Sequence, residues 1–247
     1  MPATNQPDNA RRDSPWPART APPPLHPDEV HVWRFDLDTA PADLAAELDA
    51  GERSRAERFR DTLRQTRAVA AQGTLRRILG AYLNQKPAGL RFQRGAHGKP
   101  AVDGELQFNL SHSRNTALLA VTVGREVGVD LEYQRPLDAA GRLARRFFTE
   151  AEAAALDALP LSTRQQAFYR AWTRKEALLK AMGLGIAGHL RSVEVTVDGA
   201  ETPSWRALTA ETSGAWVLRD LPTLEGYAAA VAADSDGWHL RCMAWRG

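Results

Sequence analysis

The sequence has one cysteine, Cys242, among its 247 residues, and a net charge of only +2. A single cysteine excludes an internal disulfide and a metal site built from cysteines, and it fits a reducing compartment, so we expect a cytoplasmic protein. The small net charge gives no argument for a nucleic-acid partner. No uninterrupted apolar run approaches the roughly 20 residues that span a membrane. The arginines near the start are not followed by the apolar segment of a secretory signal, so we expect no membrane partner.

At 247 residues the chain is long enough for one large domain or two small ones. Residues 1–28 are rich in Pro, Ala, Asp and Arg, and we expect a disordered tail there, because such a composition buries too little apolar surface. The rest shows a rough plan of helices followed by strands, twice over. Apolar periodicity predicts the following elements. Helices are expected over 43–60, 65–83, 142–148, 150–159 and 168–186, and strands over 30–37, 106–110, 116–123, 127–133, 193–197, 215–218, 227–232 and 238–245, the last four antiparallel.

The predicted helix over 168–186 contains charged residues whose role the sequence leaves open. Its Phe, Trp, Leu and Met side chains share one face, and Lys175 falls in the middle of that face. Glu176 and Lys180 are one turn apart and therefore neighbours. One interpretation is that Lys175 extends to solvent and that Glu176 and Lys180 form an ordinary surface pair. The other is a functional acidic and basic edge on a helix whose remaining surface is core.

The predicted strand over 127–133 places Asp130 and Glu132 on one face. Two neighbouring carboxylates repel each other unless a cation or a proton lies between them. They suit a hard, oxygen-seeking cation such as Mg²⁺, which commonly takes one or two carboxylates and completes its shell with water and phosphate. The alternative is the polar outer face of a half-exposed strand.

Several basic and polar residues upstream are suited to an anion. Eight arginines lie between positions 53 and 77, either as a solvated helix face or as an anion site, because the planar guanidinium group fits phosphate. Lys99 is preceded by Gly98, which lets backbone approach a ligand closely. Ser111 and His112 stand at the end of a predicted strand, where they bind an anion or simply form a turn.

Five segments in this order carry a family resemblance: GKP at 98–100, FNLSHS at 108–113, GVDLE at 128–132, RRFFTEAE at 145–152 and WTRKEALLKAMG at 172–183. Together they resemble the 4′-phosphopantetheinyl transferases, specifically the longer Sfp-type branch. This resemblance implies an α+β fold of two similar halves, over 29–126 and 127–247, with the active site between them. Each half is expected to pack helices on a small antiparallel sheet, and the protein is expected to be a monomer.

The resemblance also implies an activity. These enzymes transfer 4′-phosphopantetheine from coenzyme A to a serine of an apo acyl or peptidyl carrier protein and release adenosine 3′,5′-bisphosphate. They use Mg²⁺, with Mn²⁺ as a possible substitute. The alternatives are a non-catalytic coenzyme A or nucleotide-binding regulatory module and an arginine-rich nucleic-acid binder. The intact set of acidic residues argues against the first alternative. The near-neutral charge and the lack of an aromatic platform argue against the second.

Site residues carry over by the same resemblance, position by position. The metal ligands are Asp130, Glu132 and Glu176, and the catalytic residues are Glu176, Lys180 and Glu152. Lys180 contacts the diphosphate, and Glu152 helps to deprotonate the incoming serine. Coenzyme A is expected to contact Arg55, Arg67, Lys99, Pro100, Ser111, His112, Asp130 and Lys180. One position departs from the pattern. Glu52 stands where the family often has lysine, so Arg53 or Arg55 is the expected substitute.

Overall fold

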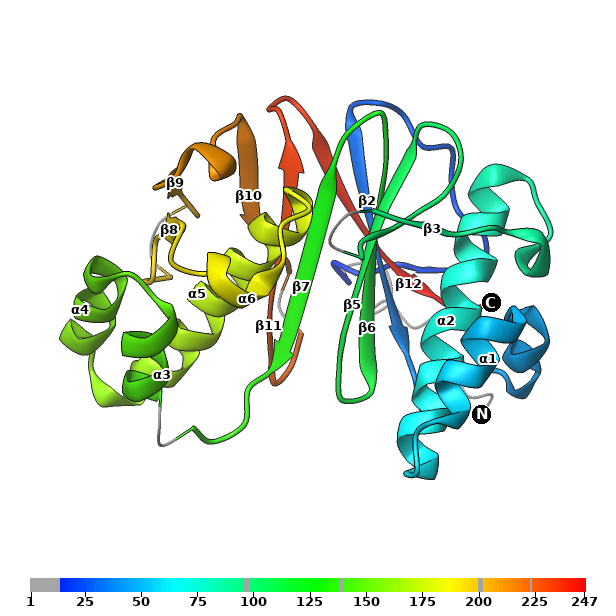
Figure 1. The fold of residues 1–247 in the computed structure, drawn as a ribbon, viewed down its shortest axis with the longest axis horizontal. Helices are drawn as coiled ribbons and strands as arrows, with labels where there is room; N and C mark the ends of the chain where they lie inside the picture. Colours follow the sequence, from blue (N-terminus) through cyan, green and yellow to red (C-terminus); the bar gives the residue numbers. More distant parts are fainter. Residues whose placement is uncertain (1–13, 96–97, 138–139, 200–201, 223) are drawn as a thin grey trace, which may run out of the picture.

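The computed structural model describes residues 14–247 apart from 96–97, 138–139, 200–201 and 223. Two sheets stand side by side in the middle of the molecule, with helices on the outer side of each (Figure 1). The result is a mixed α+β protein, as the sequence predicts. No helix of the described ranges is both long enough and apolar enough to cross a membrane.

The first sheet has the strand order β1-β12-β2-β6-β5. Its strands are β1 (Ala18–Arg19), β2 (Glu29–Asp36), β5 (Leu106–Ser113), β6 (Thr116–Val123) and β12 (His239–Trp245). β12 pairs in parallel with both β1 and β2, whereas β2, β6 and β5 are antiparallel. The expectation of a purely antiparallel sheet in each half is therefore wrong for this sheet. The alternation of apolar and polar residues shows which face of a strand is buried. It does not show that the strand pairs in parallel with another that is distant in sequence.

One face of the first sheet is covered by α2 (Thr62–Leu83), preceded by η2 (Ala42–Glu47) and α1 (Ala50–Glu57). The single helix predicted over 43–60 is thus broken in two. Asp49 accounts for the break, because its side chain accepts a hydrogen bond from the Glu52 amide and starts a new helix in a capping box. The short elements η3 (Pro87–Gly89), β3 (Gln93–Arg94) and β4 (Pro100–Ala101) lead from α2 to β5.

The second sheet has the order β10-β11-β7, with β7 (Val127–Tyr133), β10 (Trp216–Asp220) and β11 (Tyr227–Asp234), and is antiparallel throughout. The helix α5 (Leu161–Ala181) packs across it. Around α5 lie α3 (Ala140–Phe147), α4 (Glu150–Ala158), α6 (Ile186–His189), β8 (Val193–Val195), β9 (Trp205–Ala207) and η4 (Ala210–Thr212). An apolar layer between the two sheets joins them. It includes Val32, Leu118, Val129 and Val231.

Residues 14–28 are ordered, so the expected disordered tail over 1–28 is wrong for this part; residues 1–13 lie outside the described residues. Trp16 is 4% exposed and packs into the layer between the sheets. The Pro17 carbonyl accepts a hydrogen bond from the Ala244 amide, and β1 extends the first sheet. The large apolar surface of Trp16 stabilises this segment, and the average composition on which the prediction of disorder was based does not reveal it.

Gly128 brings the backbone of α5 onto β7. A Cβ atom at this position would lie less than 3.0 Å from the Ala177 carbonyl oxygen, the Ala181 amide nitrogen and the Lys180 carbonyl carbon. Only a glycine allows this approach, because all three neighbours are backbone atoms that no rotamer change moves aside. The contact sets the height and rotation of α5 against the neighbouring Asp130.

We predict that Gly128→Ala lowers the free energy of unfolding by about 3 kcal/mol or more, because a methyl group must displace helix backbone. Chemical denaturation measures the change. Gly89→Ala is the matched control, since a Cβ there meets nothing within 4 Å. We expect that control to shift stability by less than about 1 kcal/mol. Equal effects of the two substitutions would contradict the close packing of α5 on β7.

Candidate active site

The two sheets face each other along β5 and β7, and side chains of β5 bridge the gap. Ser111 Oγ donates to Asp130 Oδ1 over 2.8 Å. Ser113 Oγ donates to Glu132 Oε2 over 2.9 Å and accepts from the Tyr133 amide over 3.1 Å. Because alternate residues of a strand point to the same face, the two hydroxyls of β5 lie side by side opposite the two carboxylates of β7. The polar ends of FNLSHS and GVDLE meet, although 19 positions separate each bonded pair.

The helix α5 adds Glu176 and Lys180 to this row. The Lys180 ammonium forms a short ion pair with Asp130 Oδ1 and lies 3.2 Å from Ser111 Oγ and 3.4 Å from Glu176 Oε2. Their spacing of four residues, one helical turn, puts both side chains above β7. The Glu176–Lys180 pair is therefore part of a buried cluster, and the interpretation as an ordinary surface pair is wrong.

The cluster holds more acidic groups than basic ones. Burial raises the pKa of Glu176 to about 7, and the neighbouring Asp130 charge adds to the effect. Burial also raises the pKa of Glu132. Burial lowers the pKa of Lys180, but the charges of Asp130 and Glu176 outweigh it and the net shift is upward. Burial raises the pKa of Asp130 as well, so the pKa values of all three carboxylates are shifted upward, while Lys180 stays a cation.

The donor atoms suit a hard divalent cation. Asp130 is 2% exposed, and its Oδ2 is buried with no hydrogen-bond partner in the part of the chain that the structure describes. An unpaired buried carboxylate oxygen is costly unless a proton or a cation compensates it. Within the same described residues, however, no three His, Cys, Asp or Glu side chains are grouped closely enough to hold a metal ion. Lys180 is the cation that Asp130 and Glu176 share, whereas Glu132 is bonded to Ser113.

Lys99 and Pro100 lie toward one end of the row. Lys99 Nζ forms an ion pair with Glu126 at 2.7 Å and donates to the Val127 carbonyl at 3.1 Å. Lys99 also lines a pocket of about 220 Å³ together with Lys180. Pro100 begins β4 and is half-buried. The GKP segment therefore reaches the same cleft as the lysine of α5.

The remaining predicted phosphate ligands form no hydrogen bond or ion pair with the carboxylates within the described ranges. His112 follows Ser111 on β5 with an exposed side chain, and the surrounding protein atoms and the nearby Lys180 charge lower its pKa. Arg67 makes a two-bond ion pair with Asp38 at 2.7 and 2.8 Å. Arg55 is exposed on α1. Among the described residues, no hydrogen bond or ion pair connects either arginine to the carboxylates.

Glu52 has a structural explanation. It is buried, completes the capping box of α1 with Asp49 and accepts from Arg76 over 2.7 Å. A lysine here would lose both the cap and the ion pair. The glutamate at position 52, in place of the family's lysine, is thus explained by the packing of α1 on α2.

Glu152 does not join the cluster either. Lys175 is completely buried, and its ammonium donates to both carboxylate oxygens of Glu152 at 2.7 and 2.6 Å. Glu152 also accepts from the Val195 and Thr149 amides, both at 2.8 Å. These contacts join α4, α5 and β8. Glu152 therefore has structural contacts, and its part in deprotonating the serine stays a prediction. The interpretation that Lys175 extends to solvent is wrong.

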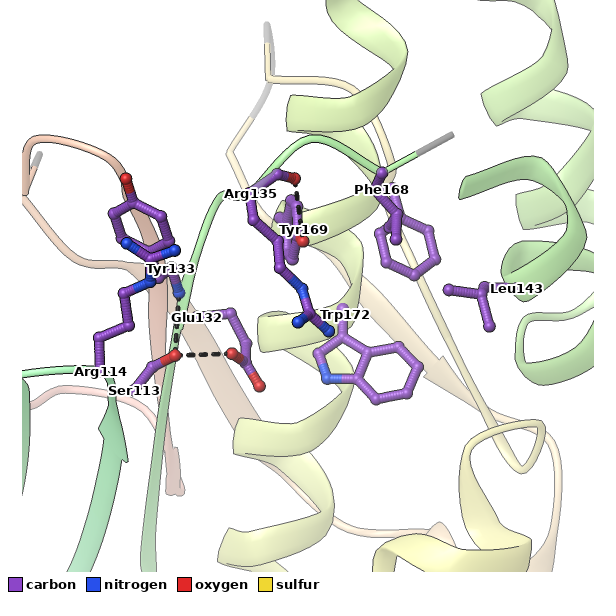
Figure 2. Close-up of a pocket in the computed structure, with 10 residues that line it drawn as sticks. Ser113, Arg114, Glu132, Tyr133, Arg135, Leu143, Phe168, Tyr169 and Trp172 are labelled. Atoms are coloured by element: carbon purple, nitrogen blue, oxygen red, sulfur yellow. Dashed lines mark hydrogen bonds between the residues drawn. The ribbon is translucent and has the colours of Figure 1, made fainter. Parts of the chain in front are cut away.

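The sequence did not reveal a pocket of about 370 Å³ at the other end of the row. Figure 2 shows Phe168 and Trp172 of α5 on one side of it and Glu132 on the other. The Arg114 guanidinium stacks 3.6 Å from the centre of the Tyr133 ring at the edge of this pocket. The residues come from two strands, the turn between β5 and β6, the segment after β7 and two helices, so only the aromatic spacing of α5 was visible in the sequence.

A buried row of carboxylates with a lysine and serine hydroxyls, set between two pockets, is typical of enzymes that act on phosphate-bearing substrates. The family model of the 4′-phosphopantetheinyl transferase superfamily matches residues 126–232. The chain is also 42% identical over 219 residues to the 4′-phosphopantetheinyl transferase HetI of Nostoc sp.. This aligned region covers 85% of this chain and 90% of that protein.

Two more relatives agree. A putative 4′-phosphopantetheinyl transferase of Synechocystis sp. is 36% identical over 172 residues, covering 64% of this chain and 70% of that protein. A phosphopantetheinyl transferase of Thraustochytrium sp. is 31% identical over 193 residues, covering 70% of this chain and 67% of that protein. The chain therefore belongs to the 4′-phosphopantetheinyl transferase family and is an enzyme. The resemblance drawn from its motifs is confirmed.

The raised pKa of Glu176 predicts a pH-dependent stability. Between the ordinary value of 4.5 and about 7, the folded state keeps a proton that the unfolded state has released, so this stabilisation is lost as the pH rises through that window. Glu176→Gln removes the titration. Its unfolding free energy minus that of the wild type should rise by about 1–3 kcal/mol across the window. Denaturation in chelator at several pH values measures it, and a constant difference would contradict the shift.

The structural role of Glu152 predicts compensation. Glu152→Gln leaves the buried Lys175 charge unpaired and should cost about 3–5 kcal/mol of stability. Adding Lys175→Met removes that charge, so the double variant should regain part of the stability and most of the transferase activity. Recovery of stability stays partial because the glutamine amide nitrogen cannot accept from the second of the two backbone amides that bond Glu152. Denaturation and rate assays on both single variants and the double variant measure the effect. A stable double variant whose rate stays about 10²-fold or more below wild type would instead make Glu152 an acid–base residue.

Proposed function

We propose that this enzyme transfers the 4′-phosphopantetheine group of coenzyme A to a serine of an apo acyl or peptidyl carrier protein, with adenosine 3′,5′-bisphosphate as the other product. The observation that carries the proposal is the contact of Lys180 with Asp130, Ser111 and Glu176 at the junction of the sheets. Phosphoryl transfer depends on positioning and on charge stabilisation more than on covalent catalysis. This cluster offers a fixed cation and a row of carboxylates at one place.

The coenzyme A diphosphate binds beside Lys180 and Ser111. Lys99 and Pro100 contact the nucleotide, because Lys99 and Lys180 line one pocket. His112, Arg67 and Arg55 are the candidates for the 3′-phosphate. For Arg67 this requires an exchange of its Asp38 partner for phosphate, which is feasible at a partly exposed ion pair.

Asp130, Glu132 and Glu176 are the residues that would hold Mg²⁺, or Mn²⁺ in its place, and the unpartnered Asp130 Oδ2 supports this. When bound, the cation supplies charge neutralisation at the diphosphate. Ser111 and Ser113 orient the carboxylates of Asp130 and Glu132 through their hydrogen bonds. Lys180 adds positive charge where the leaving oxygen develops negative charge.

Glu176 is the favoured acceptor of the serine proton. Its carboxylate lies beside Lys180 and Asp130, and its one ion pair among the described residues is with Lys180 at 3.4 Å, so it can accept a proton from an incoming hydroxyl. Glu152 is less suited, because Lys175 and two backbone amides occupy its oxygens.

The pocket of about 370 Å³ fits the pantetheine arm. It adjoins Glu132 and has an apolar wall of Phe168, Trp172 and Leu143, so it can bury the apolar parts of a flexible chain that leads away from the phosphate. The two sheets with their outer helices support the two-half arrangement. Because β5, β7 and α5 of one chain supply the entire cluster, the site needs no second copy, which supports a monomer.

The proposal predicts a gain of roughly 340 Da on a carrier serine, the mass of the pantetheine phosphate group, when apo carrier proteins are incubated with the enzyme, coenzyme A and Mg²⁺. Asp130→Asn should lower the rate by about 10²-fold or more while the protein stays folded. Asp103→Asn, which alters an exposed carboxylate outside the cluster, is the control and should keep its rate. Mass spectrometry and circular dichroism measure the outcomes. Full activity of Asp130→Asn at limiting Mg²⁺ would contradict the assignment.

A further inference from the structure

The Lys180 ammonium is held by the acidic side of the site. It donates to Asp130 Oδ1 and Ser111 Oγ and forms an ion pair with Glu176 Oε2 at 3.4 Å. Two of the three carboxylates that would bind a metal therefore hold this lysine, although its proposed role in the reaction is at the diphosphate. A phosphate that binds the ammonium competes with these contacts.

The acidic side of the site shows what Lys180 does there. Asp130 is divided: one oxygen binds the ammonium, and the other is buried with no partner among the described residues. In the same part of the chain the carboxylates are not grouped closely enough for an ion. The ammonium therefore supplies, at Asp130 and Glu176, the positive charge that a metal ion would otherwise bring.

A diphosphate changes this balance, because it offers Lys180 charged oxygens that compete with Asp130. We propose that Lys180 couples the binding of coenzyme A to that of the divalent metal: it occupies the metal carboxylates in the free enzyme and releases them when it transfers to the diphosphate. The inference rests on the proposed function. Coupling of this kind is reciprocal, so metal also strengthens coenzyme A binding.

The second lysine of the cleft provides a control. Lys99 lines the same pocket as Lys180, but its ammonium is bonded to Glu126 and to the Val127 and Ala181 carbonyls. It carries the same charge near the site, and no hydrogen bond or ion pair joins it to Asp130 or Glu176. Removing it takes away one positive charge and a proposed coenzyme A contact but leaves the metal carboxylates untouched, and saturating coenzyme A compensates for the weaker contact.

The experiment measures the dissociation constant of Mn²⁺, from the electron paramagnetic resonance signal of the free ion, with no coenzyme A and with saturating coenzyme A. The ratio of the two constants is the coupling factor. In wild type we expect coenzyme A to strengthen Mn²⁺ binding by at least about tenfold. In Lys180→Met the coenzyme-free enzyme should bind Mn²⁺ more tightly, and the coupling factor should fall by at least about fivefold.

Two further variants serve as controls. Lys99→Met should change the Mn²⁺ dissociation constants with and without coenzyme A by the same factor, so that the coupling factor stays the same. Lys180→Arg retains a cation for Asp130 and should keep weak Mn²⁺ binding in the absence of coenzyme A. It provides the test if Lys180→Met proves unstable in thermal melts. A coupling factor that is unchanged in Lys180→Met, or equally reduced in Lys99→Met, would overturn the inference. If coenzyme A has no effect on Mn²⁺ binding in wild type, the inference also fails, while a mass gain on carrier proteins would still uphold the proposed function.

Discussion

The direct contact between the backbones of α5 and β7 at Gly128 is the constraint on which the rest of the site depends. Helix and strand approach each other more closely than any side chain would permit, and this fixes both the height and the rotation of the helix. Two residues along the strand, Asp130 then lies under Lys180 and Glu176. Asp130 of β7 and Lys180 of α5 therefore meet because the neighbouring residue, Gly128, has no side chain.

This constraint concentrates charge at a largely buried place beside two pockets. Three carboxylates and one ammonium share the junction, and the surplus negative charge is relieved by a raised pKa at Glu176. The serine hydroxyls of β5 stabilise the carboxylates from the opposite sheet. A site with this surplus attracts cations, and its lysine attracts phosphate, so the same arrangement suits both components of a metal-assisted transfer.

Much of this architecture was predictable from local patterns. The strands over 116–123 and 127–133 match their predicted ranges because strict alternation and a buried apolar run leave little choice. The family resemblance assigned Asp130 and Lys180 to one site, but it did not predict their ion pair. Contacts between distant segments could not be predicted locally, among them the parallel insertion of β12, the burial of Trp16 and the Asp38 partner of Arg67. Glu152 shows the limit most clearly, because its buried partner Lys175 lies 23 positions away.

The central claim is that one junction between the sheets holds both the metal and the diphosphate of coenzyme A. A crystal structure of the complex with coenzyme A and Mn²⁺, with the metal located by anomalous scattering, tests it most directly. The account predicts a single strong anomalous peak about 2.1 Å from a carboxylate oxygen of Asp130, with the Lys180 ammonium on the diphosphate. A metal bound away from Asp130, or a diphosphate bound where Lys180 cannot reach it, would contradict the account.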